Sequence, residues 1–485
     1  MTNDHVGRRL DKRFDHATRE HGIYEKWEAD GAFKPSGTGT PFFIPMPPPN
    51  ITGRLHMGHA LFSTIQDTTI RYARMRGHQA LWLPGFDHAG LATQAKLDAE
   101  MIAAGLDPEG PSFEPFAEAY RRRLGGEIET QLRRTGASCD WSRRRFTMDE
   151  GYTRAVEAAF DICRSRDMLY RDGEDWYLRM DGLAARLLSE LDAGNLEIQP
   201  ARGEAILREF LRNIEPWCIS RQIRWGHRIP IEGETAVLDT WFSSALWPFA
   251  TLGWPADTPD MRRFYPATLI ETGDDILFFW CARMLMMGLL LTDTLPFTRI
   301  LMHGIVRDAE GRKMSKSLGN GIDPLGIIDK YGSDGMRIAL LEGCAPGTDL
   351  RIRDERLQAG RGFTTKLWNI GRFALSHLEE GNSDHEDDRE LIRRASATRR
   401  SIGEAIEAFD LHLAAAAARR FLFDDLSSWW IEVSKDRLRA GDASAKACIT
   451  QVLDRTLRMF HPITPFVTEE LRSAIGGPPL ITSSW

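Results

Sequence analysis

Two histidines, His56 and His59, stand on either side of Gly58 in the stretch 47–59. This stretch follows an apolar run and precedes a segment with helical periodicity. A helix N-terminus favours anions through its free N–H groups and its dipole, and imidazoles placed there can hydrogen-bond phosphate as charge shifts in a transition state. A four-residue motif of this kind is by itself a helix start with surface histidines. Its position between a strand and a helix favours phosphate chemistry instead.

A second motif, GRKMSKSLGN at 311–320, carries Lys313 and Lys316 three residues apart. It follows another strand pattern and is flanked by glycines, which is typical of a mobile loop. Two lysines on such a loop can close over a triphosphate and neutralise its oxygens as pyrophosphate leaves. A lysine pair alone is usually a solvated basic face. Combined with the histidine motif, it indicates a nucleotide site.

These motifs need a scaffold, and up to about residue 320 the chain alternates short apolar runs with helical patterns. The pattern predicts an α/β fold with a Rossmann-like doubly wound parallel sheet. We expect strands at 42–45, 80–83, 267–271 and 299–302, and helices at 58–75 and 276–290. From about Phe363 the spacing of Ala, Leu, Arg and Glu predicts an all-α helical bundle, with the acidic stretch 382–388 as an exposed loop between helices.

The composition is that of a soluble globular protein: 485 residues, 42% hydrophobic, 27% charged, net charge -7. It excludes fibrous and disordered classes and gives no overall basic signal, so a nucleic acid would have to bind local patches. The longest apolar stretch, near 284–291, is too short to span a bilayer, and no leader pattern is present, so we expect a cytoplasmic protein without membrane contact. Six scattered cysteines without a CxxC pair predict buried thiols and no structural zinc or other protein-bound metal.

Together, the two motifs resemble the paired signatures of class I aminoacyl-tRNA synthetases. Segments between them resemble the valyl branch of that family more than its isoleucyl or leucyl branches: 85–94 (GFDHAGLATQ), 217–222 (WCISRQ), 238–244 (LDTWFSS) and 278–280 (FFW). The resemblance covers nearly the whole chain, and the motifs occur in the expected order.

The resemblance implies ATP-dependent activation of valine, or a close aliphatic analogue, and its transfer to a valine-type tRNA by a monomeric enzyme. His56, His59, Lys313 and Lys316 would be catalytic. Mg²⁺ would accompany ATP as the counter-ion of its phosphates. The implied ATP site comprises His56, Gly58, His59, Gly273, Asp275, His303, Gly304, Val306, Lys313, Met314, Ser315, Lys316 and Ser317. Asp87 would bind the substrate ammonium group, and Pro48, Asn50, Trp241, Ile276 and Trp280 would form the side-chain pocket.

The resemblance also implies a division of the chain. Its parts are the first half of the catalytic domain at 1–165, a residual connective region at 166–230, the second catalytic half at 231–325, a stem-contact connection at 326–370 and an anticodon-binding-like bundle at 371–485. Only five residues, 171–175, stand where valyl enzymes carry a large hydrolytic editing domain, and a second excision follows residue 230. The C-terminal coiled-coil arm is also expected to be absent. Without editing, threonine should be misactivated, because valyl-tRNA synthetases are known to reject it in the synthetic pocket by only about a hundredfold.

Two positions depart from the family pattern: Phe86 stands where threonine is usual, and Asp274 where an aromatic residue is usual. Each neighbours a proposed substrate contact, so the departures indicate either an amino acid other than valine or neutral drift. Arginine clusters at 121–123, 143–145, 393–394 and 399–400 could meet RNA phosphates, but clusters of this size are more often solvated helix faces.

Other functional classes remain open. An enzyme passing the adenylate to a carrier protein or a small amine would also lose editing, although it would have little use for the bundle. An inactive regulatory paralogue conflicts with the intact motifs. A plain nucleotidylyltransferase conflicts with the resemblance of the bundle and with the tryptophan pocket.

Overall fold

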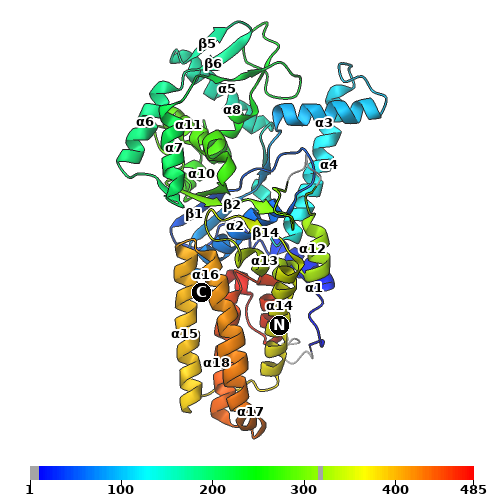
Figure 1. Cartoon of the computed structure of the whole chain (residues 1–485), viewed down its shortest axis with the longest axis vertical. Coiled ribbons are helices and arrows are strands. Elements are labelled where there is room, and N and C mark those ends of the chain that lie inside the picture. Colours follow the sequence, from blue (N-terminus) through cyan, green and yellow to red (C-terminus); the bar gives the residue numbers. More distant parts are fainter. Residues whose placement is uncertain (1–9, 315–319) are drawn as a thin grey trace.

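A parallel β-sheet forms the centre of the α/β part in the computed structural model, which describes residues 10–314 and 320–485 (Figure 1). Strand β1 (Pro41–Pro45) pairs in parallel with β2 (Gln79–Leu83). A second parallel set has the order β11 (Ile270–Gly273), β12 (Arg299–His303), β7 (Glu197–Gln199). All five residues of β2 are buried, as expected for a strand covered on both faces.

The two sets are joined at Phe43 and Thr268. The Thr268 backbone N–H donates to the Phe43 carbonyl at 2.9 Å, and the Phe43 N–H donates to Thr268 Oγ1 at 2.9 Å. The spatial order is therefore β2-β1-β11-β12-β7, and the chain moves outward in opposite directions from β1 and from β11. The predicted doubly wound sheet is confirmed. Its switch point, where such sheets bind ligands, lies between the C-terminal ends of β1 and β11.

Helix α2 (Met57–Met75) connects β1 to β2, and all of its residues except Gly58 and His59 are buried. It lies between the sheet and the helical part of the molecule, where it packs against α13 (Ser333–Leu341) and α15 (Glu386–Glu407). Burial on all sides explains its internal ion pairs: Asp67 bonds Arg71 at 2.7 Å and Arg337 at 2.7 Å, with all three side chains inaccessible. The helix that begins at the histidine motif is thus held rigidly.

Two predicted elements have different bounds. The strand expected at 267–271 lies at Ile270–Gly273, and the helix expected from Ile276 begins as a 3-10 turn, η2 (Asp274–Ile276), and a π-helical turn, η3 (Leu277–Cys281), before α11 (Ala282–Thr292). Such irregular turns are frequent at functional sites.

Together, Asp274–Thr292 make the one stretch among the described residues that is long and apolar enough to cross a membrane, with mean hydropathy 1.6. It is longer than we expected, and its 61% burial within the protein is typical of a core helix.

A smaller antiparallel sheet lies above the parallel one in Figure 1. Strand β5 (Leu169–Asp172) pairs with β6 (Asp175–Leu178), which pairs with β8 (Trp217–Cys218). A two-residue turn joins β5 to β6, and its first residue, Gly173, has φ +59°, as a two-residue hairpin requires. The other elements of this region are β3 (Gly85–Phe86), α3 (Gly90–Ala103), α4 (Phe113–Arg134), β4 (Arg145–Phe146), α5 (Glu150–Ser165), α6 (Asp181–Asp192), α7 (Arg202–Arg212), β9 (Ser220–Arg221), β10 (Val237–Leu238), α8 (Thr240–Ser244), α9 (Trp247–Ala250) and α10 (Pro259–Phe264).

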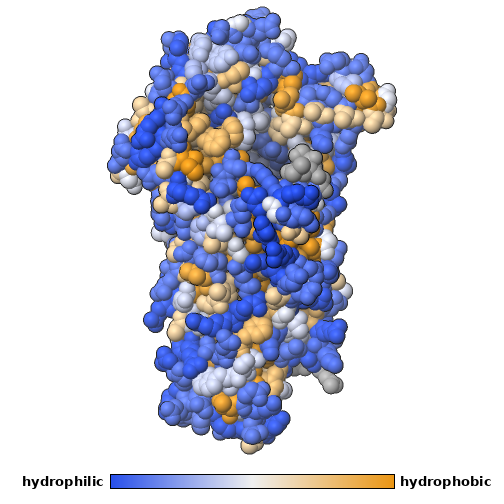
Figure 2. Space-filling model, viewed as in Figure 1, coloured by the Kyte–Doolittle hydropathy of each residue, from blue (hydrophilic) through white to orange (hydrophobic). Residues whose placement is uncertain are grey.

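The C-terminal part is a bundle of long helices, as predicted, and α14 (Asp354–Leu375), α15 and α18 (Ala443–Phe460) run alongside one another in Figure 1. In the view of Figure 2 its surface is mostly hydrophilic, with hydrophobic residues in small groups. The N-terminal helix α1 (His16–Ala29) packs against α19. The remaining elements are β13 (Val306–Arg307), α12 (Pro324–Tyr331), β14 (Leu350–Arg351), α16 (Leu411–Arg420), η4 (Phe421–Ile431), α17 (Glu432–Arg439) and α19 (Pro465–Ala474).

The prediction of an exposed loop at 382–388 is wrong at its end. Helix α15 begins at Glu386, and Asp388 is fully buried. The Asp388 carboxylate accepts hydrogen bonds from the Trp430 indole at 2.9 Å and from Arg437. An acidic residue is thus buried because partners more than forty residues away satisfy it.

Five of the six cysteines are buried, as predicted, but Cys218 is partly exposed at the edge of the antiparallel sheet. Its Sγ accepts a hydrogen bond from Arg221. The prediction of buried thiols therefore fails at this one position.

Candidate active site

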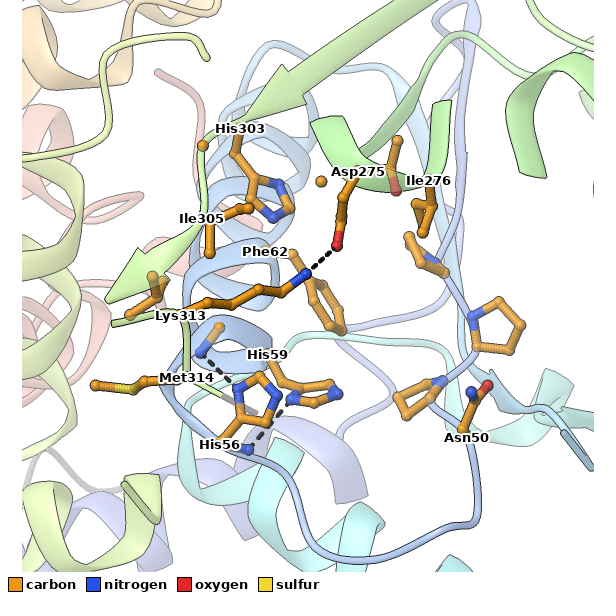
Figure 3. Close-up of a pocket in the computed structure, with 18 of the residues that line it drawn as sticks. Asn50, His56, His59, Phe62, Asp275, Ile276, His303, Ile305, Lys313 and Met314 are labelled. Carbon is orange, nitrogen blue, oxygen red and sulfur yellow. Dashed lines mark hydrogen bonds and ion pairs between the residues drawn. The ribbon is translucent and has the colours of Figure 1, made fainter. Parts of the chain in front are cut away.

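A cavity of about 390 Å³ opens at the C-terminal ends of β1, β11 and β12, beside the N-terminus of α2 (Figure 3). This is the switch point of the sheet. The described residues that line it are Pro47, Pro48, Pro49, Asn50, Thr52, His56, Gly58, His59, Phe62, Thr272, Gly273, Asp275, Ile276, His303, Gly304, Ile305, Val306, Lys313 and Met314.

The two motif histidines lie together on the cavity wall, with ring centroids 4.1 Å apart. His56 is the N-cap of α2: its Nδ1 accepts the Gly58 N–H at 3.1 Å, while the His56 N–H donates to His59 Nδ1 at 3.2 Å. In the neutral tautomers that accept at Nδ1, each ring carries its proton on Nε2. A Cβ at position 58 would lie 2.8 Å from His56 Cε1, so glycine is needed for this arrangement. The site combines a helix N-terminus with two imidazole donors, which suits an anion.

Asp275 and Lys313 face each other across the cavity, with Nζ and Oδ2 2.5 Å apart (Figure 3). Both side chains are nearly half exposed, so the pair is solvated and exchangeable. Asp275 follows β11, and Lys313 lies just after β13. A Cβ at Gly273 would lie 2.7 Å from Asp275 Oδ1, so glycine makes room for the carboxylate.

His303, at the end of β12, lines the same cavity and bonds Glu271 through Nδ1. Burial tends to lower the pKa of His303, but the carboxylates of Glu271, Asp275 and Asp274 together raise that pKa above its ordinary value. The next residue, Gly304, lies so close to the Thr348 backbone that a Cβ there would be 2.2 Å from its carbonyl. The backbone of 303–306 is thereby fixed along the cavity.

Three predicted substrate residues, Asp87, Trp241 and Trp280, lie outside the cavity and meet at helix α8. The Asp87 carboxylate accepts hydrogen bonds from Thr240 Oγ1 at 2.9 Å and from the Ser244 hydroxyl, and burial raises its pKa. The Trp280 indole donates to the Ser244 carbonyl at 3.0 Å. Trp241, which begins this helix with Thr240, stacks on Phe279 with centroids 6.0 Å apart.

Backbone contacts connect this group to the cavity. The Asp87 N–H donates to the Pro49 carbonyl at 3.0 Å, and the Ile51 N–H donates to the Asp87 carbonyl at 3.1 Å. Pro49 and Asn50 line the cavity, so Asp87 lies directly behind its wall.

Most of the residues predicted from sequence therefore come together. Those lining the cavity are Pro48, Asn50, His56, Gly58, His59, Gly273, Asp275, Ile276, His303, Gly304, Val306, Lys313 and Met314. Ser315, Lys316 and Ser317 lie outside the described residues. The sequence argument missed Pro47, Pro49, Thr52, Phe62, Thr272 and Ile305, all of which flank or lie within the motifs, and Glu271, for which no local pattern gave a signal.

The two departures from the family pattern lie away from the cavity lining. Phe86 is buried in the core beside Gly125 of α4. Asp274 forms an ion pair with Arg202 at 3.6 Å. Neither side chain lines the cavity, which agrees with the alternative of neutral drift.

Arginines of three of the four clusters pair with carboxylates. Arg121 bonds Glu118, Arg145 bonds Asp149, and Arg393 bonds Glu390. The pairs of Arg121 in α4 and Arg393 in α15 fit the interpretation of solvated helix faces, whereas Arg145 lies in strand β4.

Comparison with known families gives two matches. The profile "tRNA synthetases class I (I, L, M and V)" matches in three pieces, residues 22–174, 169–233 and 231–353. The profile "Anticodon-binding domain of tRNA ligase" matches residues 388–485. Together they cover most of the chain, in the order of the sheet and the bundle.

Curated relatives are similar over nearly the whole chain. The valine–tRNA ligase of Geobacter sulfurreducens is 31% identical over 699 aligned positions, covering 96% of this chain and 79% of the relative. That of Thermotoga maritima is 30% identical, covering 98% of this chain and 81% of the relative.

Solved structures are similar in fold at low sequence identity. One is the leucyl enzyme agnB2 of Agrobacterium radiobacter K84 in a ternary complex with tRNA and LeuAMS, with TM-score 0.82, 16% identity, and coverage of 98% of this chain and 90% of that one. Another is the Mycobacterium tuberculosis methionyl-tRNA synthetase bound by methionyl-adenylate. It has TM-score 0.77 and 20% identity, and the match covers 89% of this chain and 93% of that one.

Proposed function

The chain belongs to the class I aminoacyl-tRNA synthetases, and we propose that within this family it activates valine with ATP and transfers the valyl group to tRNA. The observation that carries the proposal is the cavity at the switch point, which gathers His56, His59, Asp275 and Lys313 from three separate segments. The identity of the curated relatives as valine–tRNA ligases supports valine as the amino acid. The profile match over 388–485 supports tRNA as the acceptor.

In the proposed reaction, the valine carboxylate attacks the α-phosphorus of ATP and pyrophosphate leaves. His56 and His59 donate hydrogen bonds to the phosphates at the N-terminus of α2, and Lys313, with Lys316, neutralises the leaving pyrophosphate. Asp275 accepts from the ribose hydroxyls, and the fixed backbone of 303–306 frames the adenine. Positioning and charge stabilisation supply the rate, so no general base is required.

Magnesium fits this site as a companion of ATP. Among the described residues that line the cavity, Asp275 is the only carboxylate, and Lys313 pairs with it. Mg²⁺ prefers phosphate oxygens and water to an all-protein cage, so the ATP phosphates would hold the ion, which would supply counter-charge. We place the enzyme in the cytoplasm, where ATP and tRNA occur together.

We propose that Asp87, held by α8, binds the valine ammonium group. Ile276, Trp241, Trp280, Pro48 and Asn50 surround the side chain. Trp280 and Asp87 both bond Ser244, so one short helix sets the relative positions of the ammonium site and the apolar wall. A small apolar pocket of this composition suits a branched aliphatic side chain.

We also propose that the enzyme has no editing domain. The tight β5–β6 turn supports this proposal, because it lies within residues 171–175, where the sequence predicts that the insertion is missing. The family profile breaks at 169–174 and at 231–233, the two positions where the sequence predicts excisions. The alignment to the Geobacter relative, 699 positions, is longer than this chain of 485 residues, so the relative contains inserted segments that this chain lacks.

Replacing Asp275 with asparagine is expected to raise the KM for ATP about tenfold, since a hydrogen bond to a charged group contributes ~1.5–3 kcal/mol. The KM for valine should change little. Steady-state pyrophosphate exchange, measured at varied ATP and then at varied valine, gives the two KM values separately. Asp274→Asn is the matched control, because it removes the adjacent carboxylate, which pairs with Arg202 outside the cavity lining. Equal effects of the two variants would contradict the role of Asp275.

The proposed function is tested by pyrophosphate exchange into ATP with a panel of amino acids. We expect exchange with valine, weaker exchange with threonine, and none with charged or aromatic amino acids. Exchange that prefers an unrelated amino acid would overturn the choice of valine. Absence of exchange with every amino acid would favour the inactive paralogue.

A further inference from the structure

A chain of buried hydrogen bonds runs from the core of the sheet to the cavity. The Trp82 indole donates to Gln66 Oε1 at 2.8 Å, Gln66 Nε2 donates to Glu271 Oε2 at 2.7 Å, and Glu271 Oε1 bonds His303 Nδ1. Trp82, Gln66 and Glu271 are at most 1% exposed. Of the four residues, only His303 lines the cavity.

The four members come from different elements. Gln66 lies in α2, the helix that begins at the histidine motif, Trp82 in β2, Glu271 in β11 and His303 at the end of β12. The hydrogen-bond chain therefore links α2, the helix proposed to bind the phosphates, to the wall of the cavity formed by His303.

The direction of these hydrogen bonds is fixed by chemistry. An indole only donates, so Gln66 must present its oxygen to Trp82 and its amino group to Glu271. Glu271 Oε2 consequently accepts. The other carboxylate oxygen, Oε1, bonds His303 Nδ1, and a carboxylate oxygen there accepts from an Nδ1–H.

The other edge of the imidazole points away from this chain. A Cβ built on Gly273 would lie 3.6 Å from His303 Nε2, which places Nε2 at the Gly273 wall of the cavity beside Asp275. Figure 3 shows His303 and Asp275 on the same side of the cavity. Glu271 at Nδ1 and Asp275 beside Nε2 both favour the doubly protonated ring, in which Nε2–H is a donor.

We propose that Glu271 is a positioning residue that holds His303 as an imidazolium whose Nε2–H donates to an oxygen of the nucleotide bound beside Asp275. The raised pKa of His303 agrees with this protonation state. The inference rests on the proposed function, because the ligand is the ATP that the enzyme uses. Glu271 itself is fully buried and acts only through His303.

The test is a double-mutant cycle of Glu271→Gln, His303→Asn and their combination, with ATP affinity measured by calorimetry in the absence of amino acid. An asparagine amide can replace the Nδ1–H donor toward Glu271 but lacks Nε2, so His303→Asn removes only the contact with the nucleotide. We expect each single variant to weaken ATP binding about tenfold and the double variant to be no worse than His303→Asn. The KM for valine should stay within twofold.

Glu469→Gln is the control for loss of a buried carboxylate. Glu469 lies in the bundle and accepts the Leu480 N–H at 3.1 Å. This substitution should lower the thermal midpoint without changing ATP affinity. A Glu271→Gln variant that folds and binds ATP like the wild type, or effects that add in the double variant, would overturn the inference.

The same data separate this inference from the proposed function. A wild-type protein that binds ATP but supports no amino-acid-dependent exchange would contradict the function, while the calorimetric cycle would still decide the role of Glu271. A wild-type protein that does not bind ATP would overturn both.

Discussion

Replacing His56 with asparagine is expected to slow valine-dependent pyrophosphate exchange by about 10²-fold or more while leaving the protein folded. Loss of one preorganised donor to a transition state typically costs 10²–10³ in rate. His56 does two things: its Nδ1 caps α2 through the Gly58 N–H, and its ring lines the cavity. Asparagine is among the best N-cap residues, so it keeps the cap and removes the imidazole edge that we propose binds the phosphates.

His385 offers a matched control for this substitution. It is the N-cap of α15, and its Nδ1 accepts the Asp387 N–H at 3.3 Å, the same arrangement in a helix of the bundle. His385→Asn should leave exchange unchanged. His56→Ala should lose both functions, with the rate loss of His56→Asn and a further loss of about 1 kcal/mol in unfolding free energy. An exchange rate for His56→Asn within threefold of wild type would contradict the catalytic role.

The second large effect concerns threonine. Because we propose that the enzyme has no editing domain, threonyl-tRNA formed by it should accumulate, and the half-life of threonyl-tRNA in the presence of enzyme should equal its spontaneous half-life. Valyl-tRNA synthetases discriminate against threonine in the synthetic pocket by only about a hundredfold, and the apolar wall that we propose from Ile276, Trp241 and Trp280 would penalise one hydroxyl weakly. The measurement is deacylation of preformed threonyl-tRNA, with and without enzyme.

A synthetase that carries an editing domain is the positive control in that assay, since it should clear the threonyl product. Rapid deacylation by the present chain would contradict the absence of editing. The β5–β6 turn and the two breaks in the family profile would then reflect a displaced hydrolytic site rather than a lost one.

The parts of the site that follow from sequence are those encoded locally. His56, Gly58 and His59 form one helix cap, so their spacing alone predicts their geometry. The strands at 42–45, 80–83 and 299–302 follow from apolar runs, and the structure confirms them within one residue.

Other features depend on contacts between distant segments. The Asp275–Lys313 pair joins residues 38 positions apart, and the hydrogen-bond chain from Trp82 to His303 spans three strands of the sheet and helix α2. Glu271 is a charged residue within a strand, and only the partners Gln66 and His303 explain its burial. The sequence predicts a loop at Asp388 because the partners that explain its burial, Trp430 and Arg437, lie far along the chain.

Aminoacylation of total tRNA with labelled valine tests the central claim most directly. The account predicts that the enzyme charges a valine-accepting tRNA and that His56→Asn reduces charging in proportion to its loss of exchange. Valine-dependent exchange without charging of any tRNA would contradict the account and would favour an enzyme that passes the adenylate to another acceptor.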